Sequence, residues 1–353
     1  MKESDNIYHF FYTQNKISYL IIRKIILDLN LHLDKCVILQ KSEVSKDSAV
    51  KHIDVRKFMI KNRALFWKNW PILKRKKIEL SKELDLENIK FVFYNSSFTF
   101  WYNTFLINHP NCIQHNFLEE GASAYCSKEI RDSMNRARFL KINFILRKFL
   151  ITLNHKLTHT HDPFNNLERI HKTEVVYALI KDAYQHKNVK VISDIFTPTK
   201  LNQDFDLILA PSRLSNKGSG FISVDDLLEV FDEVLDLFLK RGYTNIAVKF
   251  HPEENSHIKL YFEDIIKSNT GLKIEILENN ISIENVALAQ KPIIVTDTSA
   301  IALYCAPLGS KVYTYRELLK TKSAKYREIA PEIPEKLDDK LISLKELPNK
   351  IQQ

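Results

Sequence analysis

The sequence predicts an α/β protein built from two doubly wound, Rossmann-like domains. The chain of 353 residues is 44% hydrophobic and 11% aromatic and has only 6 glycines, which is typical of a folded chain rather than a disordered one. Because one hydrophobic core seldom serves more than ~250–300 residues, this length favours two domains. Short apolar runs alternate with segments of helical periodicity, and such alternation predicts parallel sheets covered by helices.

The first series of alternating elements occupies the N-terminal half. A strand begins the series, and a helix is expected at 16–31. The expected strands are Ile7–Thr13, Cys36–Gln40, 89–94, Cys112–Leu118 and 189–195. Most are short runs of apolar, β-branched and aromatic residues, which favour buried strands of a parallel sheet.

The alternation starts again after residues 196–206, and we place the domain boundary between residues 198 and 199. The expected strands of this second series are Leu207–Ala210, 246–250, 272–277, 292–296 and 312–315, and the expected helices are Val224–Lys240, 257–267, 283–289 and 300–306. We expect 312–315 to close the sheet. Ligands of such sheets bind at the carboxyl ends of the strands, so candidate functional residues are sought there.

Composition limits the classes of partner and compartment. The chain has 52 Lys and Arg against 43 Asp and Glu, a net charge of +9, which favours anionic partners. Nucleic acid is not expected, because no recognised nucleic-acid-binding module accompanies the charge. The four cysteines form no CxxC pair, which argues against a zinc site and favours a reducing cytoplasm. Without a signal peptide or an apolar run of ~20 residues, we expect contact with a membrane only from its surface.

Two acidic residues follow the expected strand Cys112–Leu118. Glu119 and Glu120 stand at its carboxyl end, and Gly121 allows a sharp turn of the backbone. Neighbouring side chains of an extended chain point in opposite directions, so one carboxylate is expected to face the site and the other the scaffold. A carboxylate with a moderately raised pKa suits a general base for a sugar hydroxyl. The alternative is a solvated turn.

A histidine follows the expected strand 246–250. His251 comes directly before Pro252, which fixes the backbone after it. Histidine can donate a hydrogen bond or a proton to a phosphate leaving group near neutral pH. The alternative is a structural histidine at a strand end.

A pair of hydroxyl residues follows the expected strand 292–296. Thr298 and Ser299 are expected at the N-terminus of the next helix. Backbone N–H groups and hydroxyls together form an anion site at such a position. The alternative is a plain helix cap.

These three motifs, in this order along the chain, resemble those of the bacterial sialyltransferases. Glu119–Glu120–Gly121, His251–Pro252 and the Thr298–Ser299 pair are similar to the acidic-acidic-Gly, His-Pro and Ser/Thr motifs of the lipooligosaccharide, capsule and polysialic acid enzymes. The motifs span about residues 115–315. Each is short, and their order, spacing and position at strand ends make the resemblance more specific. Thr-Ser replaces Ser-Ser here, a change that keeps both hydroxyls.

The resemblance implies a GT-B fold, in which two Rossmann-like domains face each other across a cleft. It implies a CMP-activated donor, CMP-sialic acid, and inversion at the anomeric carbon. We expect no metal and no other cofactor, because CMP carries one phosphate and needs a divalent cation less than a diphosphate donor does.

The resemblance also assigns roles. Residues 1–198 are implied to bind the acceptor and to carry the base, either Glu119 or Glu120, and residues 199–353 are implied to bind the CMP-sugar. The residues implied to contact the phosphate of CMP are His251, Thr298 and Ser299, with Pro252 beside the histidine. By analogy of fold, the stretch 331–353 packs back on the N-terminal domain.

Two further segments fit a nucleotide pocket. Glu284 stands at the start of a short helix, where its carboxylate can accept hydrogen bonds from ribose hydroxyls or complement the helix dipole. Ser212 and Arg213 follow the first strand of the second series and can contact phosphate or the sialic acid carboxylate.

Two patterns that resemble metal sites are interpreted otherwise. Asp204 and Asp206 form a DxD sequence, but they precede a strand and are expected in a solvated turn. His155, His159 and His161 lack an HExxH spacing, so we interpret them as structural or acceptor-lining residues.

The densest basic stretch is 56–77, in which aromatic and aliphatic residues alternate with Lys and Arg. Two interpretations remain open. The stretch can lie on an anionic membrane at the inner face of the plasma membrane, or it can form a helix with an apolar core face and a solvated basic face.

The sequence therefore predicts a metal-independent, inverting sialyltransferase that acts on a cell-surface glycan, lipooligosaccharide or capsule, with a lipid-linked acceptor. One alternative is a GT-B transferase that uses another CMP-activated nonulosonic acid or a Kdo-type donor. A second is a non-catalytic glycan-binding protein of the same fold.

Overall fold

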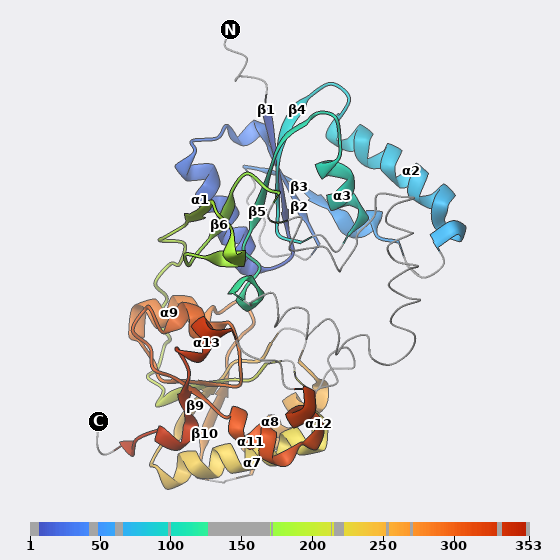
Figure 1. The fold of residues 1–353 in the computed structure, drawn as a ribbon. Coiled ribbons are helices and arrows are strands. Elements are labelled where there is room, and N and C mark those ends of the chain that lie inside the picture. The colour runs from blue at the N-terminus through green and yellow to red at the C-terminus, as the bar shows by residue number, and fades with distance from the viewer. Residues whose placement is uncertain are drawn as a thin grey trace. The chain divides into compact units, whose positions relative to one another are not determined.

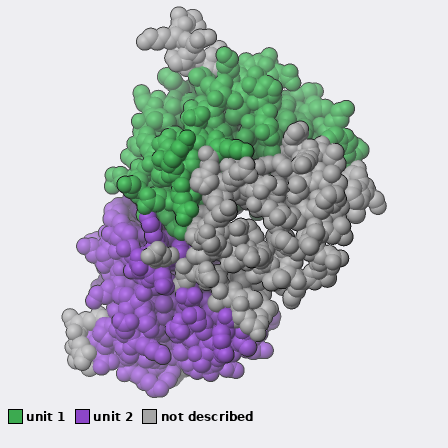
Figure 2. All heavy atoms as spheres, in the orientation of Figure 1, with its two compact units in different colours: residues 1–195 green, residues 196–353 purple. Residues whose placement is uncertain are grey.

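A computed structural model of the protein describes residues 7–41, 49–60, 66–97, 100–125, 170, 172–212, 214, 222–251, 254–268, 271–329 and 334–350. The chain divides into two compact units, residues 1–195 and residues 196–353 (Figures 1 and 2). Each unit has its own parallel sheet with helices, so the predicted α/β fold class is confirmed.

The sheet of the first unit has parallel strands in the spatial order β3-β2-β1-β4-β5-β6-β7. The strands are β1 Ile7–Thr13, β2 Cys36–Gln40, β3 Lys51–Asp54, β4 Lys90–Asn95, β5 Cys112–Leu118, β6 Val176–Ala178 and β7 Val189–Val191. β1 pairs with β2 on one side and with β4 on the other. The direction of the strand order therefore reverses between β1 and β4, and this is where sheets of this type bind ligands.

Helices cover both faces of the first sheet (Figure 1). α1 Lys16–Asp28 lies on one face, and α2 Phe66–Leu84 and α3 Trp101–Ile107 lie on the other. Leu73 and Leu80 of α2 pack into a core that includes strand residues such as Phe10. Short 3-10 helices are η2 Leu33–Lys35, η3 Val55–Phe58, η4 Ala122–Tyr125 and η6 Ala183–Gln185.

The sheet of the second unit has parallel strands in the order β10-β9-β8-β11-β12-β13. The strands are β8 Leu207–Ala210, β9 Asn245–Val248, β10 Lys273–Ile276, β11 Ile294–Thr296, β12 Val312–Thr314 and β13 Ile342–Ser343. β8 pairs with β9 and with β11, so the strand order reverses between β8 and β11. Both units thus repeat the doubly wound arrangement.

The helices of the second unit also lie on two sides of their sheet (Figure 1). They are α7 Val224–Lys240, α8 Ser256–Lys267, α9 Ile283–Gln290, α10 Ile301–Cys305, α11 Arg316–Lys322, α12 Ala324–Ile329, α13 Glu335–Asp338 and η7 Leu344–Glu346. Phe231 of α7 and Phe262 of α8 belong to the same core as strand residues such as Val248. In the described parts of the chain, no helix is both long and apolar enough to cross a membrane.

The C-terminal stretch adds a strand to the second unit, and its expected contact with the N-terminal domain stays a prediction. β13 pairs with β12, so 312–315 does not close the sheet as predicted. Tyr243 donates a hydrogen bond from its hydroxyl to the carbonyl of Pro348 at 2.9 Å, and Lys350 Nζ lies 2.7 Å from Asp206 Oδ1. These contacts hold the end of the described chain against the second unit.

Candidate active site

The carboxyl ends of the central strands in the first unit bring polar residues to one edge of the sheet. Asn15 follows β1, Lys41 follows β2, Ser96 follows β4 and the pair Glu119–Glu120 follows β5. Because these strands are parallel neighbours, their carboxyl ends share one edge, and the edge includes the point where the strand order reverses. We take it as the candidate site of the first unit.

The side chain of Glu119 makes its hydrogen bonds to residues of the first unit. It is fully buried, and one carboxylate oxygen, Oε2, accepts the backbone N–H of Leu179 at 2.6 Å. The hydroxyl of Tyr125 donates a second hydrogen bond to the carboxylate, and that hydroxyl in turn accepts the N–H of Ile180 at 3.3 Å. Burial and the neighbouring Glu119 raise the pKa of Tyr125. Glu119 therefore holds the residues after β6 against the end of β5.

Glu120 has a different environment. It is partly exposed, and burial raises the pKa of its carboxyl to about 7, although the positive charge of Lys41 acts to lower it. Its backbone carbonyl accepts a hydrogen bond from Asn15 Nδ2 at 3.4 Å. Gly121 follows with a φ of +120°, a conformation that favours glycine and turns the chain away. A carboxyl with a pKa near 7 matches the requirement for a general base at neutral pH.

Residues that the sequence reasoning did not single out complete this edge. Lys41 Nζ lies 5.1 Å from the centre of the Phe100 ring. Asn95 and Ser96 are fully buried, and within the described chain Asn95 Nδ2 and Ser96 Oγ have no hydrogen-bond partner. Buried polar atoms normally have partners, so these two are unusual. The polar sequence directly after the apolar strand β4 is the signal that could have identified them.

The second unit has an equivalent edge. Ser212 follows β8, His251 lies just beyond β9, and Asp297, Thr298 and Ser299 follow β11. The structure thus brings the predicted Ser212, His251 and hydroxyl pair to one edge of the sheet. His251 is exposed, and its carbonyl accepts the N–H of Glu254 at 2.9 Å. Pro252 and Arg213 lie outside the described residues.

Asp297 connects three strand ends at this edge. Its side chain is fully buried, and the Ser212 hydroxyl donates to its Oδ2. The Thr314 hydroxyl, at the end of β12, donates to the Asp297 carbonyl. Burial raises the pKa of Asp297, although hydrogen bonds from Ser212 and from the N–H of Thr298 act to lower it. The sequence assigns no role to Asp297, which directly precedes the hydroxyl pair Thr298–Ser299.

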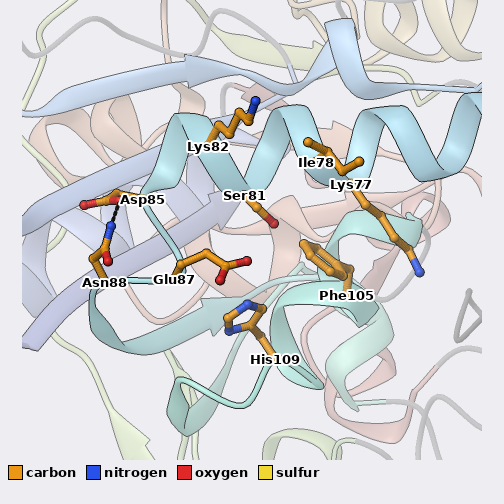
Figure 3. Close-up of a pocket in the computed structure, with 9 residues that line it drawn as sticks. All are labelled: Lys77, Ile78, Ser81, Lys82, Asp85, Glu87, Asn88, Phe105 and His109. Atoms are coloured by element: carbon orange, nitrogen blue, oxygen red, sulfur yellow. Dashed lines mark hydrogen bonds between the residues drawn. The ribbon is translucent and has the colours of Figure 1, made fainter.

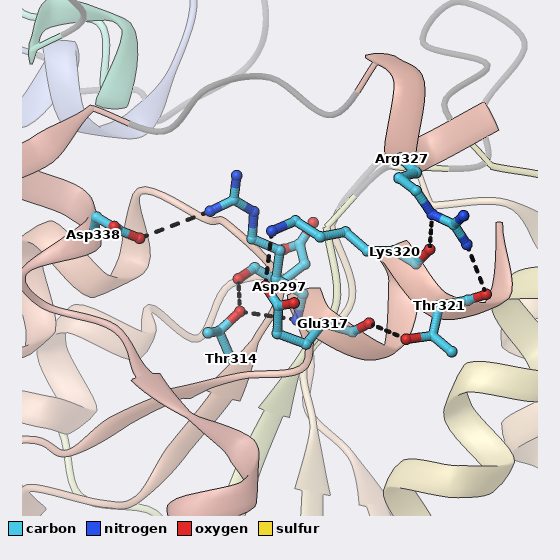
Figure 4. A network of polar contacts seen from close by, with 8 residues as sticks. Asp297, Thr314, Glu317, Lys320, Thr321, Arg327 and Asp338 are labelled. Atoms are coloured by element: carbon cyan, nitrogen blue, oxygen red, sulfur yellow. Dashed lines mark hydrogen bonds and ion pairs between the residues drawn. The ribbon is translucent and has the colours of Figure 1, made fainter. Parts of the chain in front are cut away.

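Polar contacts continue from Asp297 into the next helices, as Figure 4 shows. Thr314 Oγ1 accepts the N–H of Arg316 at 3.2 Å, and the Arg316 side chain lies 3.8 Å from Asp338 Oδ1. Further along, Arg327 Nε donates to the carbonyl of Lys320 at 3.0 Å. These contacts fix α11 and α12 relative to the strand ends that carry Thr298 and Ser299.

The hydroxyl pair lies before a helix that is shorter than expected. α10 begins at Ile301, and its N-cap residue Ala300 makes no side-chain cap hydrogen bond. Ser299 Oγ accepts the N–H of Ile301 at 3.3 Å, so this hydroxyl serves the backbone of the first turn. A five-residue helix contributes little dipole, and any anion binding by Thr298 and Ser299 depends on the hydroxyls themselves.

Glu284 lies in the first turn of α9, where an acid complements the helix dipole. The hydroxyl of the N-cap residue Ser282 donates to Glu284 Oε2 at 2.5 Å. This contact explains its position without a ligand, and contact with ribose stays a prediction.

The residues set aside as metal ligands divide into two groups. Asp206 Oδ2 accepts the N–H groups of Thr244 and Asn245 at 2.8 and 2.9 Å, so it braces the amino end of β8. The three histidines His155, His159 and His161 lie outside the described residues. Among residues that the structure describes, no group of three or more His, Cys, Asp and Glu is placed to hold a metal ion.

A cavity of about 500 Å³ lies elsewhere in the first unit (Figure 3). Its lining residues are Lys77, Ile78, Ser81, Lys82, Asp85, Glu87, Asn88, Phe105 and His109. Asn88 and His109 precede β4 and β5, so this cavity lies at the amino ends of the strands. Doubly wound sheets bind their ligands at the opposite edge, and we do not assign the cavity to the active site.

Comparison with solved structures supports the fold. A candidate UDP-N-acetylglucosamine 2-epimerase from Listeria monocytogenes is 11% identical, with a TM-score of 0.52 over 93% of this chain and 92% of that one. The glycotransferase of kitacinnamycin is 8% identical, with a TM-score of 0.51 over 98% and 88%. The S. aureus MnaA–UDP co-structure is 13% identical, with a TM-score of 0.50 over 88% and 79%.

Comparison by sequence identifies the family. No curated protein sequence matches significantly. The model of the alpha-2,8-polysialyltransferase (POLYST) family matches residues 11–313, which include all three motifs that carry the resemblance, and the expected relationship to bacterial sialyltransferases is confirmed. With its two parallel sheets, the chain belongs to the alpha-2,8-polysialyltransferase family and is a sialyltransferase-type glycosyltransferase of the GT-B fold class.

Proposed function

We propose that the protein is an inverting sialyltransferase that takes sialic acid from CMP-sialic acid, and that Glu120 is its base. The observation that carries the proposal is the contrast between the two adjacent carboxylates. Glu119 is fully buried and bound by Leu179 N–H and the Tyr125 hydroxyl. Glu120 is partly exposed at the strand end and has a pKa of about 7.

The reaction then follows from the charges. Glu120 takes the proton of the acceptor hydroxyl, and the oxygen forms a bond to the anomeric carbon. The bond from that carbon to the phosphate oxygen breaks, and CMP leaves with the electron pair. His251, Thr298 and Ser299 donate hydrogen bonds to the phosphate as its charge develops. Attack opposite to the leaving group inverts the anomeric configuration.

The remaining assignments rest on the same proposal. Residues 1–198 bind the acceptor, and residues 199–353 bind the donor, with Ser212, Arg213 and Glu284 near the nucleotide. No metal is required, because CMP has one phosphate. The acceptor is a lipid-linked cell-surface glycan, lipooligosaccharide or capsule, met at the inner face of the plasma membrane. The S. aureus structure of similar fold was solved with UDP, which is consistent with a nucleotide ligand for this chain.

The test is release of CMP from CMP-sialic acid by the purified protein in the presence of EDTA and a sialylated acceptor. We expect release to persist with EDTA and to fall at least ~100-fold in Glu120→Gln and in His251→Ala, the usual scale for a lost proton-transfer or charge-stabilising group. His32→Ala, an exposed histidine in the first unit, is the matched control and keeps full activity.

Other outcomes reassign the protein. Loss of release in folded Glu119→Gln with Glu120→Gln active moves the base to Glu119. Turnover only with another CMP-activated nonulosonic acid or a Kdo-type donor changes the donor. An absence of turnover with every CMP-sugar favours a glycan-binding protein of this fold.

A further inference from the structure

The helix α2 presents two different apolar surfaces. One surface is in the core, where Leu73, Leu80 and Leu84 are 1%, 0% and 4% exposed. The other is in solvent, where Trp70 and Ile78 are 46% and 49% exposed. A solvated helix normally keeps its large apolar residues on the core side, so the second surface needs an explanation.

The exposed apolar residues are surrounded by positive charge. α2 carries six Lys or Arg residues and two Glu residues. Trp70, Lys74, Ile78 and Lys82 are spaced four residues apart, so they form one stripe along the helix. All four are exposed. We call these residues, together with Arg75, the α2 stripe.

Acidic residues do little to offset this charge. Glu83 lies 2.5 Å from Lys57 of η3, and Glu79 lies 3.5 Å from Arg75, so both acids already have basic partners. The Arg75–Glu79 pair is exposed and therefore weak, so Arg75 can exchange Glu79 for a lipid phosphate. Asp85 and Glu87 line a cavity with Ile78 and Lys82, and the six basic residues of α2 outnumber these four acids. The stripe therefore has two features of interfacial helices. It carries apolar side chains, one of them a tryptophan, and it carries cations next to them.

We propose that the α2 stripe docks the protein on an anionic lipid bilayer, with Trp70 and Ile78 in the headgroup region and Lys74, Arg75 and Lys82 against the lipid phosphates. Charge complementarity favours this partner over a second copy of the chain, whose identical stripe would repel it. The exposed apolar side chains favour lipid over a soluble polyanion, which offers them no apolar environment.

The structure also shows which residues of the basic stretch 56–77 are accessible to a membrane. Of the residues in 56–77, Phe58 and Leu73 are buried in the core and are not available to a membrane. The stripe instead extends beyond residue 77 to Ile78 and Lys82. The core interpretation thus applies to the side of α2 that carries Leu73, and we assign the membrane interpretation to the side that carries the stripe.

The test is cosedimentation of the full-length protein with vesicles of phosphatidylcholine alone or with about one-third phosphatidylglycerol, at ~0.1 M salt. We expect binding to the anionic vesicles only. Lys74→Gln/Arg75→Gln/Lys82→Gln weakens it at least ~10-fold, since each cation near an anionic surface contributes about a factor of five. Trp70→Ser/Ile78→Ser weakens it by a similar factor.

Matched controls remove the same chemistry elsewhere. Leu260→Ser/Ile266→Ser removes two exposed apolar residues from α8, and Lys187→Gln/Lys311→Gln/Lys340→Gln removes three exposed cations. Both leave binding unchanged. As a second measurement, brominated lipid quenches part of the tryptophan fluorescence of the wild type, and this quenching is lost in Trp70→Phe.

Three outcomes overturn the proposal. They are equal binding to neutral vesicles, an equal loss in the control variants, and soluble heparin binding that depends on Trp70 and Ile78 as vesicle binding does. Vesicle binding needs no donor, so its failure leaves the proposed transfer reaction untouched, and loss of transfer in Glu120→Gln leaves the docking untouched.

Discussion

Glu120 combines an accessible position with an environment that disfavours its charge. Burial raises its pKa to about 7, and Lys41 opposes that effect. Glu119, one residue earlier, accepts hydrogen bonds from the N–H of Leu179 and the hydroxyl of Tyr125. The alternation of side chains along an extended chain places the two carboxylates in different environments. The sequence did not show which of the two carboxylates would be buried. That depends on Leu179 and Ile180 after β6, which lie about 60 residues further along the chain.

The first prediction concerns pH. The proposed base acts when deprotonated, so kcat/KM rises with pH through a midpoint near 7 and levels off above ~8. Removal of the Lys41 charge in Lys41→Met raises the pKa of Glu120 further, so the midpoint moves to higher pH. Lys90→Gln, at the amino end of β4, is the control. A midpoint that does not respond to Lys41→Met would separate the titration from Glu120.

The second prediction concerns Tyr125. Tyr125→Phe removes the donor to Glu119 and leaves the Ile180 N–H without its acceptor, so we expect a loss of ~1–3 kcal/mol in the free energy of unfolding. Tyr19→Phe is the matched control, because the buried Tyr19 hydroxyl has no hydrogen-bond partner in the described chain. Urea denaturation measures both. Equal losses would mean that the Tyr125 hydroxyl does not support the turn.

At the scale of elements, the strands that carry several large apolar residues were predicted best. β1, β2, β5 and β8 have the boundaries expected from the sequence: β2 and β8 are almost entirely apolar, and β1 and β5 are rich in apolar and aromatic residues with polar residues among them. β3, β6 and β13 were missed; β6 is buried but has only three residues. β3 is an edge strand with one buried residue in four, and β13 has only two residues, so their pairing depends on the neighbouring strand rather than on their own pattern.

The positions of the candidate residues were predictable in the same way, and their contacts were not. The rule that ligands bind at strand ends located Glu119, Glu120, His251 and the Thr298–Ser299 pair. It gave no sign of Lys41, which acts on Glu120 from a different strand end. Contacts between strand ends depend on the spatial order of the strands, and a single sequence does not reveal that order.

The third prediction belongs to the strand ends of the second unit. Asp297→Ala removes the acceptor of Ser212 and opens a hole where the ends of β8, β11 and β12 meet. We expect a loss of about 2–4 kcal/mol in the free energy of unfolding, measured by urea denaturation. Asp339→Ala, an exposed acid in the same unit, is expected to change it by less than ~0.5 kcal/mol. Similar values for both would show that the Asp297 contacts add nothing.

At the scale of the whole molecule, the fold survives very low sequence identity. Structures 8–13% identical match most of the chain, because a doubly wound sheet requires only apolar strands, amphipathic helices and turns at the right places. In such folds the function depends on residues at the strand ends, so one fold can serve several functions. The family is identified by its model over residues 11–313 and not by identity to these structures.

The fourth prediction concerns the net charge of +9. A positive molecule attracts an anionic donor, so the KM for a CMP-sugar is expected to rise several-fold between ~0.05 and ~0.5 M NaCl as the charges are screened. Sucrose of equal osmolality is the control and leaves KM unchanged. A KM that is independent of salt would limit the role of charge to short-range contacts.

Both ends of the described chain leave from sheet edges that carry no candidate site residues. Ile7 begins β1, and Lys350 is held by Asp206 before β8, so each lies at the amino edge of its own sheet. A fluorescent label attached at Lys350 would therefore stand at the edge of the second sheet opposite Ser212, His251 and Thr298. Such a label could report on the second unit without lying beside its candidate site residues.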